Sequence, residues 1–328
     1  MASAPARFNR YDYPALRPFT PVLHREDGAI QVGLDQDQAV VLAGVSPALG
    51  QLLTRLDGFH RLPELRRLAR ELGVALNLLD WALRTLDQAQ LLMEGESVSR
   101  RGPGAGAGRR IRLVGAGRLG TMIAESLLGS GIDVLYVVDN DPLDSELHPR
   151  GGAVGTQAEG LAAQLGSSGD TRITVLNHWS KPDGSPPDLT VVASDRLECD
   201  RVVGEALTRT DQPHLLVRAR AGGVLVGPLV VPGSTACLRC TDLTRRDADP
   251  GWPVLLPQLQ RMKVGISEAA VRWAGGVAAT QVLAFLQGGT PESWGATVEI
   301  SPADYITRRR SWSMHPGCGC GWGATAQW

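Results

Sequence analysis

The sequence predicts two domains: a small module of three strands and three helices, then a larger α/β domain with a mainly parallel sheet. The segment SRRGPGAGAGRR, residues 99–110, consists mostly of Gly, Ala and Arg and shows no periodic pattern of apolar residues. This composition is typical of a linker. Three β-prone runs and three helical patterns precede this linker. A strand, a glycine-rich turn, an amphipathic helix and a second strand follow it. We therefore expect domains at residues 1–98 and 111–328.

The β-prone runs of the first domain lie at residues 22–24, 29–33 and 39–43, and REDG fits a hairpin turn between the first two. Ser46-Pro47 and Pro63 are typical starts for two helices. In the third helical pattern, LNLLDWALRTLDQAQLL, one face carries Leu76, Leu79, Leu83 and Leu86. A module of about 90 residues is small but large enough to fold.

The second domain opens with RIRLVGAGRLGTMIAESLLGSGIDVLYVVDND, which has the order and length of a βαβ unit. Further strands are predicted in ITVLNHW, DLTVVASD, HLLVRARAGGVLVGPLVV and GATVEISP. A long helix rich in small residues is predicted in SEAAVRWAGGVAATQVLAFLQGG. We expect a sheet that is parallel at first, with an antiparallel extension around GGVLVGPLVV.

Three glycines, Gly115, Gly117 and Gly120, form a G-x-G-x-x-G motif directly after the first strand. Such a turn lets backbone N–H groups and a helix N-terminus face a phosphate. Asp139 ends the second strand, where an acid can bind ribose hydroxyls. The motif does not distinguish NAD from ATP. An alternative is a nucleotide fold that has lost its ligand and keeps the glycines for helix–sheet packing.

The composition limits the cellular setting and the partners. The chain has a net charge of −1 and only two lysines, Lys181 and Lys263, so we expect no nucleic-acid partner. We find no apolar run of about 20 residues that could cross a bilayer. The start MASAPARFNRYDYP lacks the apolar region of a signal peptide. These features predict a cytoplasmic protein with no membrane partner.

Four of the five cysteines form two close pairs, Cys237 with Cys240 and Cys318 with Cys320. Four thiolates are the set that a closed structural Zn²⁺ site needs, and disulfides rarely persist in the cytoplasm. Two alternatives are a redox pair at Cys237 and Cys240 and a set of unrelated buried thiols. Cys199 is interpreted as a buried helix residue, with a nucleophile as the alternative. His315 is a weaker ligand candidate than Cys320.

The glycine turn, VVDND and PGSTACLRC with the C-terminal cysteines together resemble the ThiF/MoeB/E1 superfamily over residues 109–322. This resemblance implies an E1-like, Rossmann-type domain that uses ATP and Mg²⁺ to adenylate a C-terminal carboxylate. It also implies a homodimer. By the resemblance, the nucleotide site comprises Gly115, Gly117, Gly120, Asp139 and Asp141, with Arg150 as catalytic arginine and Asp195 as Mg²⁺ ligand.

The chain departs from the E1 pattern at three places. The family expects Asn-Leu-x-Arg-Gln around the arginine, where this chain has LHPRGG. It expects a phosphate-binding lysine about a dozen residues further on, but no lysine precedes Lys181. SDRLECDR replaces a D-N-x-x-x-R pattern. Loss of one such cation typically costs ~3 kcal/mol of transition-state stabilisation, so these departures predict weak or absent adenylation.

The first domain resembles the PqqD-like recognition element of ribosomal-peptide biosynthesis, a winged-helix-like fold that adds a leader peptide to a strand edge. The two domains together resemble ThiF-like partner proteins of azoline and thiopeptide clusters, which deliver a precursor peptide to a YcaO cyclodehydratase. The residues implied for peptide contact are Val40, Val41, Leu42, Leu79, Trp81, Leu83 and Arg84. For Leu79 and Leu83 we favour a core position, whereas Trp81 lies off the leucine face.

The sequence thus predicts a scaffold that binds a leader peptide and presents it to a YcaO-type partner enzyme. The alternative is an active ATP-dependent adenylyltransferase that uses Arg150 and Asp195. A third interpretation, an NAD(P) oxidoreductase, fits the glycine turn but leaves the cysteines unexplained. The run Arg308–Arg310 is interpreted as a solvated face that could meet an acidic partner.

Overall fold

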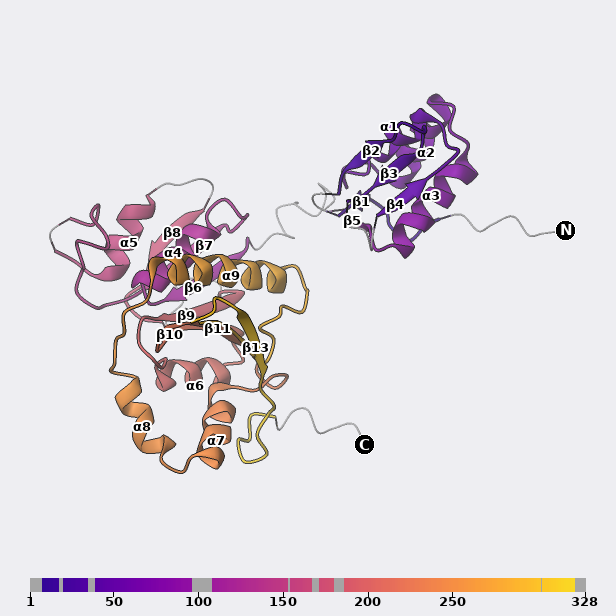
Figure 1. Ribbon diagram of the computed structural model, residues 1–328. Helices are drawn as coiled ribbons and strands as arrows, with labels where there is room; N and C mark the ends of the chain where they lie inside the picture. Colours follow the sequence, from indigo (N-terminus) through magenta and orange to yellow (C-terminus); the bar gives the residue numbers. More distant parts are fainter. Residues whose placement is uncertain are drawn as a thin grey trace. The chain divides into compact units, whose positions relative to one another are not determined.

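The chain forms two compact units, residues 1–107 and 108–328. The computed structural model (Figure 1) describes residues 8–17, 20–34, 39–95, 108–152, 154–166, 171–179, 186–301 and 303–321. Of the predicted linker, residues 99–110, the part up to residue 107 lies outside the described residues. Its last residue, Arg110, already belongs to the first strand of the second unit.

The first unit contains two small antiparallel sheets. One has the order β2-β3-β4, with β2 at Val22–His24, β3 at Ile30–Val32 and β4 at Val40–Leu42. These three strands were predicted and are confirmed. The other sheet pairs β1 (Pro14–Leu16) with β5 (Leu92–Glu94) and was missed, because it joins two short segments from opposite ends of the unit.

The helices of the first unit are α1 (Pro47–Leu53), α2 (Leu62–Glu71) and α3 (Leu76–Gln88). All three were predicted. Each buries leucines against the sheet β2-β3-β4 in one hydrophobic core. Leu79, Leu83 and Leu86 of α3 are fully buried, as the spacing of the leucines predicts.

The second unit is built on one large sheet with the order β13-β12-β11-β10-β9-β6-β7-β8. Its strands are β6 (Arg110–Val114), β7 (Val134–Val138), β8 (Arg172–Val175), β9 (Leu189–Ser194), β10 (His214–Arg220), β11 (Gly223–Val230), β12 (Ala296–Ile300) and β13 (Thr307–Ser311). The five neighbouring strands β10, β9, β6, β7 and β8 are parallel to one another. Strands β11, β12 and β13 extend the sheet beyond β10 by antiparallel pairing. This confirms the predicted fold class: an α/β unit with a mainly parallel sheet, preceded by a small β-containing unit.

Helices cover both faces of the large sheet (Figure 1). The helices of this unit are α4 (Arg118–Leu127), α5 (Gln157–Leu165), α6 (Arg201–Arg209), α7 (Leu238–Ala248), α8 (Trp252–Leu259) and α9 (Glu268–Leu286). Helices α4, α5 and α9 share one hydrophobic core with the sheet. Helices α6 and α7 pack on the opposite face, where the core includes Cys199, Cys237 and Cys240. Both faces are therefore closed, as a parallel sheet requires.

Helix α9 carries many small residues because it packs closely against α4. Gly275 lies so near Met122 that an added Cβ would be 2.4 Å from the Met122 side chain. By length and composition α9 could cross a membrane, with a mean hydropathy of 1.3, although we expected no such run from the sequence. Its contacts with α4, β10 and β11 explain this composition as that of a core helix.

Candidate functional site

The glycine turn links the end of β6 to the start of α4. Gly115 has φ +100°, a conformation that glycine adopts at little cost. An added Cβ at Gly120 would lie 1.9 Å from the Gly115 carbonyl oxygen, and one at Gly117 would lie 2.3 Å from the Asp195 carboxylate. All three predicted glycines are thus required by close contacts. The turn places several backbone N–H groups at the carboxyl end of the parallel strands.

Two of the predicted acids meet at this turn. Asp139, after β7, accepts hydrogen bonds from the Ala116 N–H (2.7 Å) and the Asp141 N–H (2.9 Å). Asp195, after β9, accepts from the Arg118 N–H (2.8 Å) and the Leu119 N–H (3.0 Å). Burial raises the pKa of the Asp139 carboxyl. The carboxylates therefore hold three N–H groups of the kind that bind phosphate in glycine turns.

Cations lie at the rim of the same strand ends. The Arg196 guanidinium is 3.7 Å from the Asp141 carboxylate. Arg196 also forms an isolated β-bridge with Lys263, so the segment around Lys263 runs beside the strand ends. Arg118 donates to the Ile266 carbonyl at 2.8 Å and thereby connects the turn to the start of α9. We did not predict a role for Arg196 or Lys263, because only the fold brings residue 263 to this edge.

Arg150 and His148 occupy different positions relative to the turn. Arg150 is exposed and donates a long hydrogen bond (3.4 Å) to the Gln164 carbonyl near the end of α5. His148 is fully buried, and its Nε2 is 2.9 Å from the Ala116 carbonyl oxygen of the glycine turn. The sequence analysis missed this support for the turn, and no local pattern around LHPRGG indicates it.

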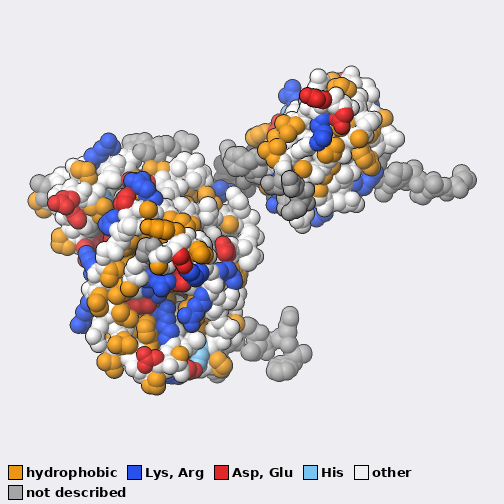
Figure 2. Space-filling view, viewed as in Figure 1, with side chains coloured by type: hydrophobic (Ala, Val, Ile, Leu, Met, Phe, Trp, Pro, Cys, Tyr) orange, Lys and Arg blue, Asp and Glu red, His pale blue; other side chains and the backbone are white. Residues whose placement is uncertain are grey.

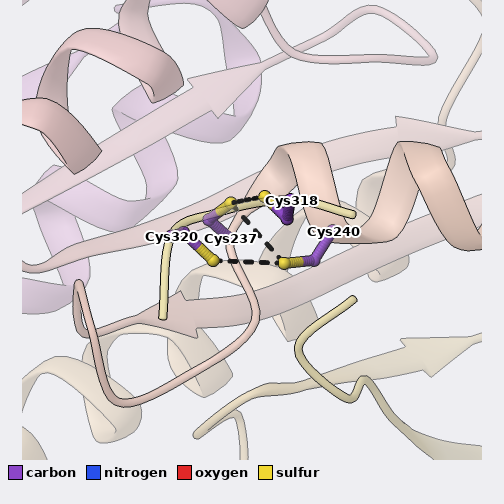
Figure 3. A group of neighbouring side chains, drawn as sticks. All are labelled: Cys237, Cys240, Cys318 and Cys320. Carbon is purple, nitrogen blue, oxygen red and sulfur yellow. Dashed lines mark hydrogen bonds between the residues drawn. The ribbon is translucent and has the colours of Figure 1, made fainter. Parts of the chain in front are cut away.

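The four predicted cysteines come together on the α6–α7 side of the sheet (Figure 3). Cys237 precedes α7 and Cys240 lies in its first turn, whereas Cys318 and Cys320 lie in the loop after β13. Adjacent sulfurs are 3.3 to 3.8 Å apart, and all four lie within 4.8 Å of one another. Sulfurs bound tetrahedrally at about 2.3 Å from Zn²⁺ would be separated by about 3.8 Å.

The surroundings of the cluster suit a structural metal. Three of the cysteines are buried and Cys320 is half-buried. Burial raises the pKa of the Cys320 thiol to about 12, so four thiolates need a cation to neutralise them. The cluster is therefore consistent with a structural zinc site. His315 is not part of this group: its Nε2 is 2.8 Å from the Asp247 carboxylate, and its Nδ1 accepts a hydrogen bond from the Gly317 N–H (3.0 Å).

Cys199 lies apart from the cluster, in the loop before α6 rather than in the helix that we expected. It is fully buried, and burial raises the pKa of its thiol to about 11. A buried, protonated thiol is a poor nucleophile. The structure therefore supports the interpretation of Cys199 as a small core residue.

The predicted peptide-contact residues lie in the first unit, where β4 and α3 contact each other. Val41 is 49% exposed and Trp81 is 41% exposed. Val40 and Arg84 are half-buried. Leu42 is 1% exposed, so only its backbone lies at the strand edge. Among the described residues, β4 pairs with β3 on one side and has no strand on the other.

No family model and no curated protein matches the sequence. Solved structures match the fold. Escherichia coli MccB solved with ATP has a TM-score of 0.61 at 16% identity and covers 94% of this chain and 99% of its own. The microcin C7 biosynthetic enzyme MccB in complex with N-formylated MccA has a TM-score of 0.61 at 14% identity, with the same coverage. PaaA has a TM-score of 0.59 at 15% identity and covers 90% of this chain and 99% of its own.

Proposed function

We propose that this protein binds a ribosomally made precursor peptide at β4 and α3 and presents it to a partner modifying enzyme of the YcaO cyclodehydratase type. The observation that carries the proposal is the edge of β4, which has no neighbouring strand among the described residues and lies beside a helix that exposes a tryptophan. Val41 on β4 and Trp81 on α3 expose 49% and 41% of their surfaces. The fold likeness to MccB solved with N-formylated MccA supports a peptide ligand.

The geometry suggests how such a peptide would be held. An extended segment can satisfy the free backbone groups of β4, which provides affinity for many sequences. Val41 points away from the core that buries Leu42, because successive side chains of a strand alternate in direction. Val41 and Trp81 then offer apolar surface to the peptide, and Trp81 has the large side chain typical of a binding hot spot.

Two features of the second unit support a role in presentation rather than adenylation. The Asp195 carboxylate holds two N–H groups at the start of α4, where a phosphate would bind. In addition, the position of the superfamily's phosphate-binding lysine has no lysine here. We propose that the glycine turn mainly secures α4 against the sheet. The four cysteines would hold a structural Zn²⁺, which joins α7 to the loop after β13 and neutralises the thiolates.

A second candidate function is ATP-dependent adenylation of a C-terminal carboxylate, with Arg150 and Asp195 in the roles that the E1 superfamily implies. One observation favours it. The Arg196 guanidinium is 3.7 Å from the Asp141 carboxylate, and the Lys263 backbone pairs with Arg196, so cationic residues are present at these strand ends despite the missing lysine. The fold likeness to MccB solved with ATP agrees with this candidate.

Selection from a display library of extended peptides on the immobilised full-length protein tests the peptide site. We expect an enriched peptide whose affinity falls about tenfold or more with Trp81→Ala or Val41→Arg. Phe59→Ala is the matched control, because Phe59 is 64% exposed in the same unit but lies outside β4 and α3. Equal losses in the Phe59→Ala protein, or no loss in the other two, would refute the proposed site.

Calorimetric titration with ATP and Mg²⁺ distinguishes the two roles. For a presentation protein we expect no binding by the native chain, and a gain on Asp195→Asn if the carboxylate blocks phosphate. An adenylyltransferase should instead bind ATP–Mg²⁺ in the native form and lose binding with Asp195→Asn. Pyrophosphate exchange that depends on a peptide carboxylate and is lost with Arg150→Ala would establish the second candidate.

A further inference from the structure

The edge strand β13 differs in character from the rest of the large sheet. It pairs with β12 on one side, and within the described residues no strand lies on its other side. All five of its residues, Thr307–Ser311, are exposed. An edge strand of this kind presents free backbone N–H and C=O groups to solvent.

Three consecutive arginines occupy the centre of this strand. Arg308 pairs with the Asp304 carboxylate. Arg309 donates to the Glu292 carbonyl oxygen (2.9 Å) and the Ser311 hydroxyl (2.7 Å). The Arg310 guanidinium lies 4.2 Å from the centre of the Trp312 ring. Figure 2 shows basic side chains gathered on this face of the larger unit, near the position of β13 in Figure 1.

The charges of Arg309 and Arg310 are not neutralised locally. Among the described residues, no carboxylate oxygen lies within 4.0 Å of either guanidinium, whereas Arg308 has Asp304 and Arg220 has Glu299. Neighbouring residues of a strand point to opposite faces of the sheet. The edge therefore presents an unneutralised positive charge on each face, at adjacent positions.

A second copy of this chain is a poor occupant of the edge. Antiparallel pairing of two β13 strands about Arg309 would place Arg308 of one copy opposite Arg310 of the other, and like charges directly opposite each other are destabilising. The same charges would attract an extended segment with acidic side chains on both faces. Tyr305 and Ile306, which are 68% and 55% exposed, offer apolar contacts just before the strand.

We propose that β13 binds an extended acidic peptide segment as an added strand of the large sheet. Two consecutive acidic residues of the segment would place one carboxylate near Arg309 and the other near Arg310. The free backbone groups of β13 would provide the hydrogen bonds. This surface belongs to the second unit and is separate from the peptide site proposed at β4 and α3, so either proposal can fail without the other.

Fluorescence anisotropy with the full-length protein and a short labelled peptide tests this proposal. The peptide carries a central Glu-Glu pair between Thr and Val residues. We expect binding that weakens with salt and falls about tenfold or more in the Arg309→Glu/Arg310→Glu protein. Arg309→Gln/Arg310→Gln replaces this variant if the charge reversal prevents folding. Arg272→Glu is the matched control, because Arg272 is an exposed arginine on α9.

Four further measurements can overturn the proposal. Equal affinity for a Gln-Gln peptide would show that acidic side chains are not recognised. Unchanged affinity for a peptide N-methylated along one edge would exclude strand addition, because simple charge attraction does not need the N–H groups. Tighter binding of a single-stranded oligonucleotide, lost with the same arginine changes, would assign the surface to nucleic acid. Binding that Trp81→Ala abolishes would assign the peptide to the first unit.

Discussion

Cys199 and Cys237 are both buried cysteines on the same side of the large sheet, yet they have different chemistry. Cys199 is fully buried and lies outside the group of four cysteines, and burial raises the pKa of its thiol to about 11. Cys237 lies 3.5 Å from the Cys318 sulfur and 3.8 Å from the Cys240 sulfur. The spacing of the cysteines in the sequence predicts this difference, because only Cys199 lacks a close partner.

Replacement of Cys237 should therefore remove the metal. We expect Cys237→Ser to lower the zinc content from about one ion per chain to near zero and to destabilise the second unit by several kcal/mol, since metal binding is coupled to folding. Metal analysis and thermal denaturation of the purified protein measure both effects. Cys199→Ser is the control and should keep its zinc. Zinc-free native protein, prepared under reducing conditions, would contradict the prediction.

His214 is a buried residue with an incomplete set of hydrogen bonds. Its side chain is fully buried, Nδ1 is 2.9 Å from the Gln212 carbonyl oxygen, and Nε2 has no partner among the described residues. It stands beside Thr190 in the sheet, which in turn stands beside Arg112. Each of these two neighbours also has a buried polar atom without a partner among the described residues. Burial lowers the pKa of His214 to about 4.

This low pKa predicts that stability falls in acid. The unfolded chain protonates His214 below about pH 6.5, whereas the folded protein resists protonation down to about pH 4. Its contribution is therefore complete above pH 6.5 and is lost as the pH falls toward 4, by about 3 kcal/mol in all. Denaturant unfolding at several pH values measures this loss. It should be absent in His214→Gln and unchanged in His178→Gln, at an exposed histidine.

At the scale of elements, helix α9 contains two adjacent glycines with opposite roles. Gly275 faces α4, where an added Cβ would lie 2.4 Å from the Met122 side chain and 2.9 Å from the Met122 carbonyl oxygen. An added Cβ at Gly276 would meet nothing within 4 Å. The close packing of α4 and α9 therefore depends on Gly275 and not on Gly276.

Substitutions at these two positions should have opposite signs. We expect Gly275→Ala to lower the free energy of unfolding by about 1–3 kcal/mol, because the helices must move apart. Gly276→Ala should raise it by about 0.5–1 kcal/mol, since alanine favours the helix and meets no neighbour. Urea unfolding of the two proteins, measured side by side, checks both signs. Stabilisation by Gly275→Ala would show that α4 and α9 are less tightly packed than the structure indicates.

The elements that the sequence predicted are those with a local pattern. The βαβ unit around Gly115 combines an apolar strand, a glycine turn and an amphipathic helix within about 30 residues, so its fold could be read directly. Strand β13 has the sequence TRRRS, without apolar alternation, and forms only because β12 supplies a partner. Helix α8 has no buried residue, so it lacks the amphipathic pattern on which the prediction of a helix depends.

At the scale of the whole molecule, the two units should unfold separately. Each has its own hydrophobic core, and the four-cysteine cluster belongs to the second unit alone. We expect two thermal transitions in calorimetry. A strong chelator should lower only the transition of the second unit, because a metal that binds the native form stabilises the unit that holds it. One transition, or an equal shift of both, would contradict this prediction.

The whole-molecule features that could be predicted were those fixed by residue type. Cysteine spacing indicated the four-cysteine cluster, and the composition of residues 99–110 predicted a linker between two domains. The positions of His148 under the glycine turn and Lys263 beside Arg196 could not be predicted, since they depend on how distant segments meet. The hydrogen bonds from the start of α4 to the Asp195 carboxylate likewise could not be predicted, because they form only in the folded chain.

The cysteine cluster also fixes an order of events during synthesis. Its two cysteine pairs are 81 residues apart in sequence, counted from Cys237 to Cys318. The ribosome must therefore synthesise the second pair before the four-cysteine cluster can form. The first unit, complete by residue 107, emerges some 200 residues earlier. At roughly 5–20 residues per second this interval lasts on the order of 10–40 seconds. A nascent chain still attached to the ribosome would thus already carry a finished β4 edge, available to the proposed peptide before the rest of the protein has folded.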